Sequence, residues 1–392
     1  MSKLLLVCLL CASFSACNVY RLDFNFADDR KFEGKILDQR EDRFADIAPM
    51  ALNEEIIAYM ELHVTDRSTD LTIVDKLQSL LFDAAYLNIE YDDAVTRTAA
   101  QTFSDRKGNC LSVVNLYIAM ARYFDVDAQF QTVEVRPSWD RRGEMLVLSQ
   151  HINALGRFNS STVYVVDFTP EITLQQLTAD IINDREARAL FFNNLGAENL
   201  ITMNLDEAIS YFKNALYLDP DLSIAWNNIG IAYSRLEDKE TAEYAYNKAY
   251  SLDRGNATAI NNLVRFYRQK GDMETSLRYA KAIERFNNNN PYFHYNLGNV
   301  AYADADYEAA RDYFEQAIKR KKSEPDFYLA LSKTYEQLGD PDAAALQYER
   351  ALESLRIAGQ IYLPSSNKVR IVDEDSILRP ASAGFSVRVT PL

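Results

Sequence analysis

The chain has 392 residues, enough for two or three domains. Hydrophobic residues make up 48% and charged residues 25%, a balance typical of folded proteins. The net charge is −15, and because an acidic surface repels phosphate backbones, nucleic acid is not expected as a partner. An apolar run of about 18 residues, the length that a membrane-spanning helix needs, does not occur.

The N-terminus has the pattern of a secretion signal, with Lys3 before an apolar run over residues 4–10. Phe14-Ser15-Ala16-Cys17 resembles the lipobox of bacterial lipoproteins, where small residues precede a cysteine that is cleaved free and diacylated. The resemblance implies a signal peptide over residues 1–16 and a lipid anchor on Cys17. Since Asn18 is not an aspartate, it also implies the outer membrane of a Gram-negative bacterium, facing the periplasm. An ordinary cleaved signal is the alternative.

Residues 17–49 show no sustained period, and we interpret them as a tether and lead-in. Apolar residues at helical spacing predict one helix from near Leu52 and another over residues 71–87, with Asp70 as a candidate N-cap. These helices open a domain that we place at residues 50–170.

A short helix is expected at residues 96–100, before the turn Gly108-Asn109-Cys110. From Cys110 to Phe124 two helical faces are apolar, which predicts a helix buried on most sides. Cys110 is therefore expected at the start of a buried helix.

Strand-like runs cover residues 128–135, 151–158 and 162–168, and a turn cluster separates the last two. Residues 137–143 are expected to form a loop that carries Trp139, and residues 171–188 a connecting helix.

Cys110 is the candidate nucleophile of this domain. After cleavage before Cys17 it is the one cysteine left without lipid, and an unpaired cysteine in an exported protein indicates a reactive thiol. The N-terminus of a helix favours the thiolate. Of the three histidines, His63, His151 and His294, only His151 lies on a strand of the same domain. It is the candidate base.

Asp167 is the candidate orienter of His151. If residues 151–158 and 162–168 form a hairpin centred on residue 159, paired residues sum to about 318 and Asp167 stands opposite His151. The register stays open by one or two residues. Each residue also has a structural alternative: a small buried cysteine, a half-buried strand histidine, and an aspartate that caps a turn.

Thr96-Arg97-Thr98-Ala99, Gly108-Asn109-Cys110-Leu111-Ser112, His151 and Val166-Asp167 together resemble the transglutaminase-like superfamily of bacterial thiol enzymes. The resemblance covers about residues 50–170. It implies a papain-related α+β fold in which Cys110, His151 and Asp167 form a catalytic triad acting on peptide or protein amides. The residue after His151 is Ile152, not the aromatic residue that often follows the family's histidine. The substrate chemistry, hydrolysis or amine transfer, stays open.

From residue 189 onward the chain repeats every 34 residues. Positions that share one register carry leucine or isoleucine, and they are Leu195, Ile229, Leu263, Leu297 and Leu331. Alanine or another small residue recurs at fixed offsets from them, which lets paired helices pack closely. The pattern resembles tetratricopeptide repeats and predicts an all-α solenoid of five repeats over residues 189–357. A tail over residues 358–392 is expected to be poorly ordered.

A ladder of asparagines, Asn194, Asn228, Asn262 and Asn296, follows the same 34-residue spacing. Asparagine can pair with both backbone groups of an extended peptide, so the ladder is a candidate peptide-binding surface. The alternative is that it braces neighbouring helices.

The predicted function is a transglutaminase-like cysteine hydrolase or acyl transferase of the cell envelope, whose repeats bind a protein or peptide. The alternative is a non-catalytic scaffold lipoprotein that binds proteins through its repeats. No residue cluster has metal-ligand spacing and no phosphate-binding loop occurs, so neither metal nor cofactor is expected.

Overall fold

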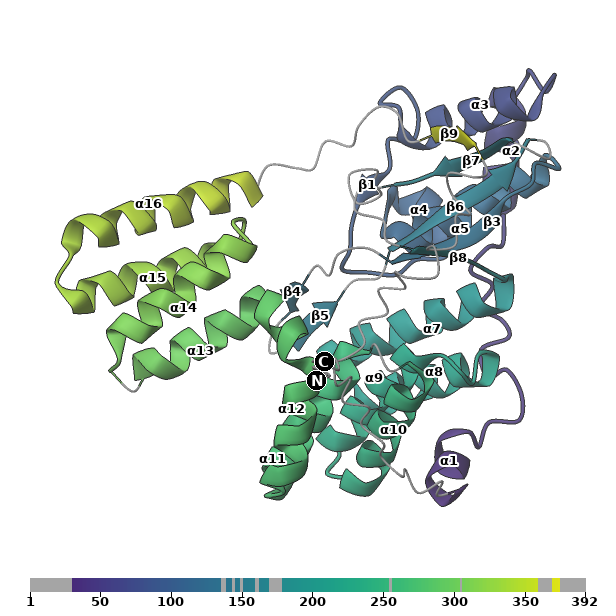
Figure 1. The fold of residues 1–392 in the computed structure, drawn as a ribbon. Helices are drawn as coiled ribbons and strands as arrows, with labels where there is room; N and C mark the ends of the chain where they lie inside the picture. The colour runs from purple at the N-terminus through teal and green to yellow at the C-terminus, as the bar shows by residue number, and fades with distance from the viewer. Residues whose placement is uncertain are drawn as a thin grey trace, which may run out of the picture.

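The structure is a computed structural model that describes residues 30–134, 139–142, 145–148, 151–158, 162–168, 178–253, 256–303, 305–358 and 369–373. These residues form an α+β domain and a helical solenoid (Figure 1). Among them, no helix combines the length and the apolar character that crossing a bilayer requires. The predicted signal peptide and Cys17 lie outside the described residues.

Four helices of the α+β domain begin at side chains that cap them. They are α2 (Glu54–His63), α3 (Asp70–Phe82), α4 (Ala99–Asp105) and α5 (Cys110–Tyr123). The N-cap of α3 is Thr69 and not the predicted Asp70, and α3 ends at Phe82 instead of continuing to residue 87. The predicted helix at 96–100 starts only at Ala99, because Thr98 caps it. The two-residue strands β1 (Glu90–Tyr91) and β2 (Lys107–Gly108) pair in parallel just before α5.

The sheet of this domain has five strands in the order β8-β3-β6-β7-β9, and every neighbouring pair is antiparallel. Its strands are β3 (Gln129–Glu134), β6 (His151–Arg157), β7 (Thr162–Val166), β8 (Thr178–Ile182) and β9 (Val369–Asp373). Helix α5 packs on the sheet, and its buried residues join the core with Phe130, Ile152 and Tyr164.

Three predictions about the surroundings of this sheet were wrong. Within the predicted loop 137–143, residues 139–142 form strand β4 (Trp139–Arg142), which pairs with β5 (Met145–Leu148). Residues 178–182 of the predicted connecting helix form β8, and the next helix starts at Asp184. Residues 369–373 of the predicted tail form β9, which pairs with β7. Strands β8 and β9 pair with strands far away in the chain, so local periodicity does not reveal them, whereas β4 pairs with its immediate neighbour β5.

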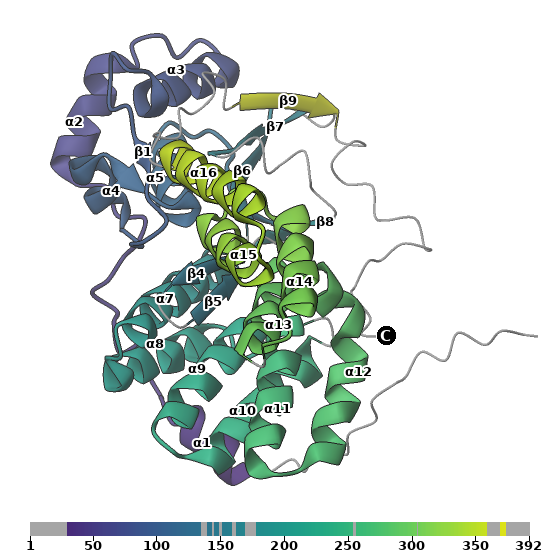
Figure 2. The same cartoon turned by 90° about the vertical axis from the view of Figure 1, so that its left-hand side faces the viewer.

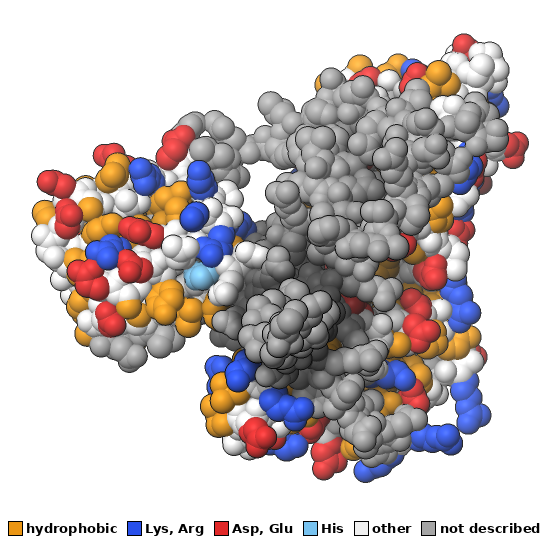
Figure 3. Space-filling view, viewed as in Figure 1, with side chains coloured by type: hydrophobic (Ala, Val, Ile, Leu, Met, Phe, Trp, Pro, Cys, Tyr) orange, Lys and Arg blue, Asp and Glu red, His pale blue; other side chains and the backbone are white. Residues whose placement is uncertain are grey.

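The solenoid confirms the predicted repeat of helix pairs. The pairs are α7 (Asp184–Ile201) with α8 (Leu205–Leu218), α9 (Ser223–Arg235) with α10 (Lys239–Leu252), α11 (Ala257–Lys270) with α12 (Met273–Asn289), α13 (Pro291–Ala303) with α14 (Tyr307–Arg320), and α15 (Pro325–Leu338) with α16 (Pro341–Ala358). Glycines allow the helices of a pair to approach: a Cβ on Gly196 or Gly298 would lie 2.5 Å from the ring of Phe212 or Phe314. Acidic and basic side chains are interspersed over α13–α16 on the face shown in Figure 3.

The lead-in is not a free tether over residues 30–49. It forms α1 (Arg30–Ile36) and then runs along the first two repeats (Figure 1). Glu33 pairs with Lys248 at 2.9 Å and Asp38 with Lys213 at 2.8 Å. The ring of Phe44 stacks on two rings of the first repeat, Phe192 and Tyr211, which also stack on each other. We call residues 30–49 the N-terminal strap. Its partners lie more than 140 positions later, which explains why it has no periodicity of its own.

The α+β domain and the first repeats share one core. Buried apolar side chains form a contiguous cluster from α2, α3 and α5 through α7 into the repeats. Figures 1 and 2 show the β4–β5 hairpin between the sheet and the solenoid, and β9 beside β7 at the edge of the sheet. The chain therefore passes between the α+β domain and the solenoid three times: after the strap, between β8 and α7, and between α16 and β9.

Candidate active site

Cys110 is the first residue of α5, and its side chain is 9% exposed. Asn109 caps the helix, since its Oδ1 accepts hydrogen bonds from Ser112 N at 2.9 Å and from Ser112 Oγ at 2.8 Å. Gly108 precedes this cap where space is short: a Cβ there would lie 3.0 Å from Ser112 Cβ. The sulfur therefore lies at a helix N-terminus, where the aligned peptide dipoles favour negative charge.

His151 opens β6, opposite Val133 of β3. The β6–β7 pairs sum to 320 instead of the expected 318, as in Ala154 with Val166. Extending this register by one residue brings Asn153, and not His151, opposite Asp167. His151 stands diagonally to the aspartate on the same sheet face, since it is two residues from Asn153. The diagonal placement still allows contact.

The structure brings Cys110, His151 and Asp167 together. The Cys110 Sγ atom lies 3.8 Å from His151 Nδ1, and His151 Nε2 lies 3.0 and 2.9 Å from Asp167 Oδ1 and Oδ2. His151 and Asp167 are each 3% exposed. One imidazole thus contacts a thiol through one nitrogen and a carboxylate through the other, which is the geometry of a nucleophile, a base and an orienting group.

The electrostatics of the site favour a protonated imidazole. Burial opposes the charge, but the hydrogen bonds and negative charges of Asp167 and Cys110 outweigh it and raise the pKa of His151 from 6.5 to about 10. An imidazolium next to the sulfur stabilises a thiolate there, because opposite charges attract strongly where water is excluded. Near neutral pH the imidazole of His151 is therefore protonated beside the Cys110 sulfur.

Asn153 is a site residue that the sequence interpretation missed. Its Nδ2 donates to Asp167 Oδ2 at 3.4 Å, and the side chain is fully buried. A signal was present, since residues two apart on a strand share a face and Asn153 follows His151 by two. Asn153 helps to orient the carboxylate that orients His151.

Thr96 and Arg97 were noted as part of a motif but not as supports of the cysteine turn. The Arg97 backbone N–H donates to Ser112 Oγ at 2.8 Å, and Asn109 Nδ2 donates to Thr96 Oγ1 at 2.8 Å. The Arg97 side chain pairs with Asp92 at 2.8 Å and with Asp105 at 3.0 Å. Residues 96–97 hold the turn from which Cys110 emerges.

The asparagine ladder makes hydrogen bonds between helices of successive repeats. Asn228 Nδ2 donates to Asn193 Oδ1 at 3.0 Å, and Asn262 Nδ2 donates to Asn227 Oδ1 at 2.9 Å. Asn194 accepts from Asn193 at 3.5 Å. These contacts favour the bracing alternative for Asn228 and Asn262. The side chain of Asn296 lies outside what the structure describes.

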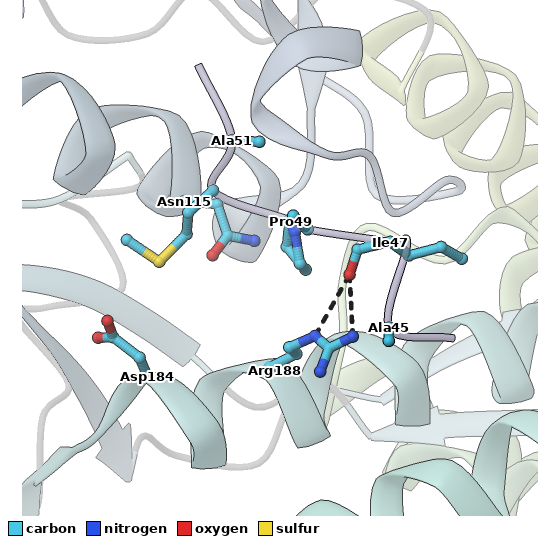
Figure 4. A pocket seen from close by; sticks show the side chains of 9 residues that line it. Ala45, Ile47, Pro49, Ala51, Asn115, Asp184 and Arg188 are labelled. Atoms are coloured by element: carbon cyan, nitrogen blue, oxygen red, sulfur yellow. Dashed lines mark hydrogen bonds between the residues drawn. The ribbon is translucent and has the colours of Figure 1, made fainter. Parts of the chain in front are cut away.

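The other histidines lie away from the thiol, His63 against Tyr59 and Tyr86 and His294 in α13. Within the described ranges, no three His, Cys, Asp or Glu side chains converge as a metal site would require. Figure 4 shows a pocket of about 210 Å³ lined by residues 45 and 47–51, by Asn115 of α5, and by Asp184 and Arg188 of α7. The Arg188 guanidinium is bound to Ile47 O there, and the pocket contains none of the three site residues.

Comparison with known proteins identifies the repeats. Tetratricopeptide-repeat models match residues 191–222, 224–256 and 295–359. Residues 191–256 and 295–359 are therefore tetratricopeptide repeats, within the solenoid that runs from α7 to α16. Such arrays present extended surfaces for protein–protein interaction and act as scaffolds. The matched ranges lie within the repeats, so the transglutaminase-like interpretation of residues 50–170 stays a prediction. None of the curated proteins matches the chain.

Solved structures resemble this array only distantly. MamA from Desulfovibrio magneticus RS-1 is 18% identical over 45% of this chain and 99% of its own, with a TM-score of 0.31. YrrB, described as a TPR protein with an unusual peptide-binding site, is 17% identical over 43% of this chain and 87% of its own, with a TM-score of 0.27. PilF of Pseudomonas aeruginosa is 20% identical over 43% and 78%, with a TM-score of 0.34. Similarity at this level carries no argument about function.

Proposed function

We propose that the α+β domain is a transglutaminase-like cysteine hydrolase or acyl transferase, and that the repeat array holds its protein partner or substrate. The observation that carries the proposal is the contact of Cys110 Sγ and Asp167 with opposite nitrogens of His151. Order along the chain, helix-start placement of the thiol and burial of the aspartate all support it.

The chemistry would proceed by acyl transfer. The Cys110 thiolate attacks the amide carbon, and a tetrahedral oxyanion forms. The Cys110 backbone N–H, at the helix start, is a candidate donor to that oxygen. His151 donates its Nδ1 proton to the leaving nitrogen, the carbon–nitrogen bond breaks, and a thioester remains on Cys110. Neutral His151 then removes a proton from water or an amine as it attacks, and the thiolate leaves. Asp167 and Asn153 keep the imidazole oriented throughout.

The test is whether His151 controls the reactivity of Cys110. Iodoacetamide labelling of Cys110 at pH 6, followed by mass spectrometry, should be rapid in the native protein. His151→Ala should lower the rate by about 10²–10⁴, the usual contribution of a positioned acid or base. His63→Ala is the matched control, because His63 packs against Tyr59 and Tyr86 and not against the thiol. Turnover of a peptide amide that Cys110→Ser abolishes would identify the reaction class.

The second candidate is a non-catalytic scaffold that binds proteins through its repeats. The comparisons favour it, because they match the repeats alone. The burial of Cys110 and His151 also favours it, since a substrate must gain access to both. This candidate predicts that His151→Ala leaves the labelling rate of Cys110 unchanged, which would overturn the enzymatic proposal.

A lipid anchor on Cys17 would place this activity at the periplasmic face of an outer membrane. The support is the lipobox-like run before Cys17. Membrane fractionation tests it: the native protein should sediment with membranes, and Cys17→Ser should release it. A Cys17→Ser form that stays with the membrane would contradict the anchor.

A further inference from the structure

A side chain of the first repeat reaches the segment that supports the cysteine turn. Glu198 lies in α7, and its Oε1 accepts a hydrogen bond from the backbone N–H of Thr96 at 2.7 Å. Thr96 is 5% exposed and belongs to the α+β domain, 102 positions earlier. A carboxylate acceptor makes this a charge-assisted hydrogen bond, stronger than one between neutral groups.

Thr96 in turn holds Asn109, the N-cap residue of α5. Its Oγ1 accepts from Asn109 Nδ2 at 2.8 Å. The Oδ1 of the same amide accepts from Ser112 N and Ser112 Oγ. Both ends of the Asn109 amide are therefore bound, one to the helix that begins at Cys110 and the other to Thr96. An amide bound at both ends cannot turn without breaking one of these contacts.

We infer that Glu198 is a positioning residue for Cys110, and that it couples the repeat array to the thiol. The inference rests on the proposed function, since it concerns the geometry of the same site. Cys110 directly follows Asn109, so any displacement of the cap moves Sγ relative to His151 Nδ1, now 3.8 Å away. Glu198 acts on the thiol through Thr96 and Asn109.

This arrangement makes the α+β domain sensitive to the first repeat. A protein partner that shifts α7 changes the hydrogen bond from Thr96 and with it the cap of α5. Small shifts matter, because a misplacement of about 1 Å can cost on the order of a hundredfold in rate. The array is therefore both a binding surface and a support of the candidate active site.

The experiment measures the rate of Cys110 alkylation by iodoacetamide between pH 5.5 and 9 in full-length protein. Glu198→Ala removes the acceptor and should lower the rate at pH 6 on the order of tenfold, with a smaller effect at pH 9. Glu198→Gln keeps an acceptor oxygen and should restore most of the native profile. A purely structural role would lower the melting temperature without changing the pH profile of the folded protein.

Thr96→Val is the second probe, should Glu198→Ala fail to fold. It keeps the shape of the side chain and the backbone bond to Glu198, but removes the acceptor for Asn109. It should show the same loss at pH 6. The matched control is Glu243→Ala, because Glu243 pairs with Lys270 and Tyr267 inside the array.

The outcomes separate the inference from the proposed function. Native profiles for Glu198→Ala and Thr96→Val, together with a large loss for His151→Ala, would overturn the role of Glu198 and leave the enzyme proposal intact. A rate that His151→Ala does not change would overturn the proposed function and, with it, the role of Glu198.

Discussion

The α+β domain and the repeat array both bury polar side chains, but for different purposes. In the array, Asn193 and Asn227 accept hydrogen bonds from Asn228 and Asn262, and each bond joins residues 35 positions apart. In the domain, Cys110, His151 and Asp167 come from a helix start, a strand start and a strand end. The bonds of the array recur with its period and brace it. The cluster of Cys110, His151 and Asp167 does not follow the repeat period. Burying its ionisable side chains costs free energy, which a purely bracing role would not require.

The largest expected difference between the two regions is in how their free energies of unfolding depend on pH. The folded pKa of His151 is about 10, above its ordinary value of 6.5. The stability that this shift contributes is fully present below pH 6.5 and is lost as the pH rises through 10. The free energy of unfolding of the α+β domain should therefore fall by on the order of a few kcal/mol over that range.

Chemical denaturation at pH 6, 8 and 9.5 measures this dependence. His151→Gln should flatten it, and His63→Gln should leave it as in the native protein. An equally steep curve for His151→Gln would show that the imidazole is not the group responsible.

Glycine substitutions compare how tightly the two regions are packed. A Cβ on Gly156 would lie 2.0 Å from Asp127 O and 2.5 Å from the Tyr164 ring, whereas the nearest atoms to a Cβ on Gly298 belong to the Phe314 ring, at 2.5 Å. A backbone carbonyl can move less than an aromatic side chain to make room for an added methyl group. Gly156→Ala should cost about 3 kcal/mol or more and Gly298→Ala about 1–2 kcal/mol in unfolding free energy.

Gly34→Ala is the control for both, since a Cβ there meets nothing within 4 Å. It should be neutral or slightly stabilising, because alanine favours a helix over glycine by about 1 kcal/mol. Equal costs at Gly156 and Gly298 would remove the distinction between the two kinds of packing.

The bracing role of the asparagines is tested by Asn227→Ala. Asn227 is 1% exposed, accepts from Asn262 and donates to Asn228 at 3.1 Å. Its loss leaves buried partners unpaired and should cost about 1–2 kcal/mol of array stability. Asn194→Ala, which removes only a 3.5 Å contact, should cost less. Thermal unfolding followed by circular dichroism distinguishes the two, and equal costs would contradict the bracing interpretation.

The smallest effect is expected at the N-terminal strap. Lys213 pairs with Asp38, which is 56% exposed, so Lys213→Ala should cost less than about 1 kcal/mol. Lys239→Ala removes a pair whose side chains are 66% and 76% exposed and should have no measurable effect. Limited proteolysis within residues 30–49 is the sensitive measurement. A cleavage rate that Lys213→Ala does not raise would show that the apolar contacts of Phe44 suffice to hold the strap.

Features that depend on local pattern could be predicted from the sequence. The 34-residue spacing of leucine and isoleucine predicted helix pairs, and the pairs are present. Gly108-Asn109-Cys110 predicted a helix start at Cys110, because Asn109 is a good N-cap and the next residues are apolar. The relative order of thiol, imidazole and carboxylate also followed from the residues, although their role in catalysis stays a prediction.

Features that depend on distant partners could not be predicted. The hairpin register was two residues from the expected one, because the length of the turn between β6 and β7 cannot be read from composition. The sequence predicts helix where β8 forms, since the β3 strand that pairs with β8 lies almost fifty positions away. The contact of Glu198 with Thr96 joins two regions that carry no common pattern.

Strand β9 gives the repeat array a mechanical property. The array leaves the α+β domain at α7, and the chain returns to the same sheet when β9 pairs with β7. Eleven backbone steps separate Ala358, the end of α16, from Val369, and a fully extended chain covers about 40 Å in that number. A solenoid that is attached at one end only can lengthen when it is pulled, because its repeats separate slightly from one another. A load on α16 is carried through the covalent chain to Val369, which pairs with Val166 next to Asp167, so this end of β9 would separate from β7 first.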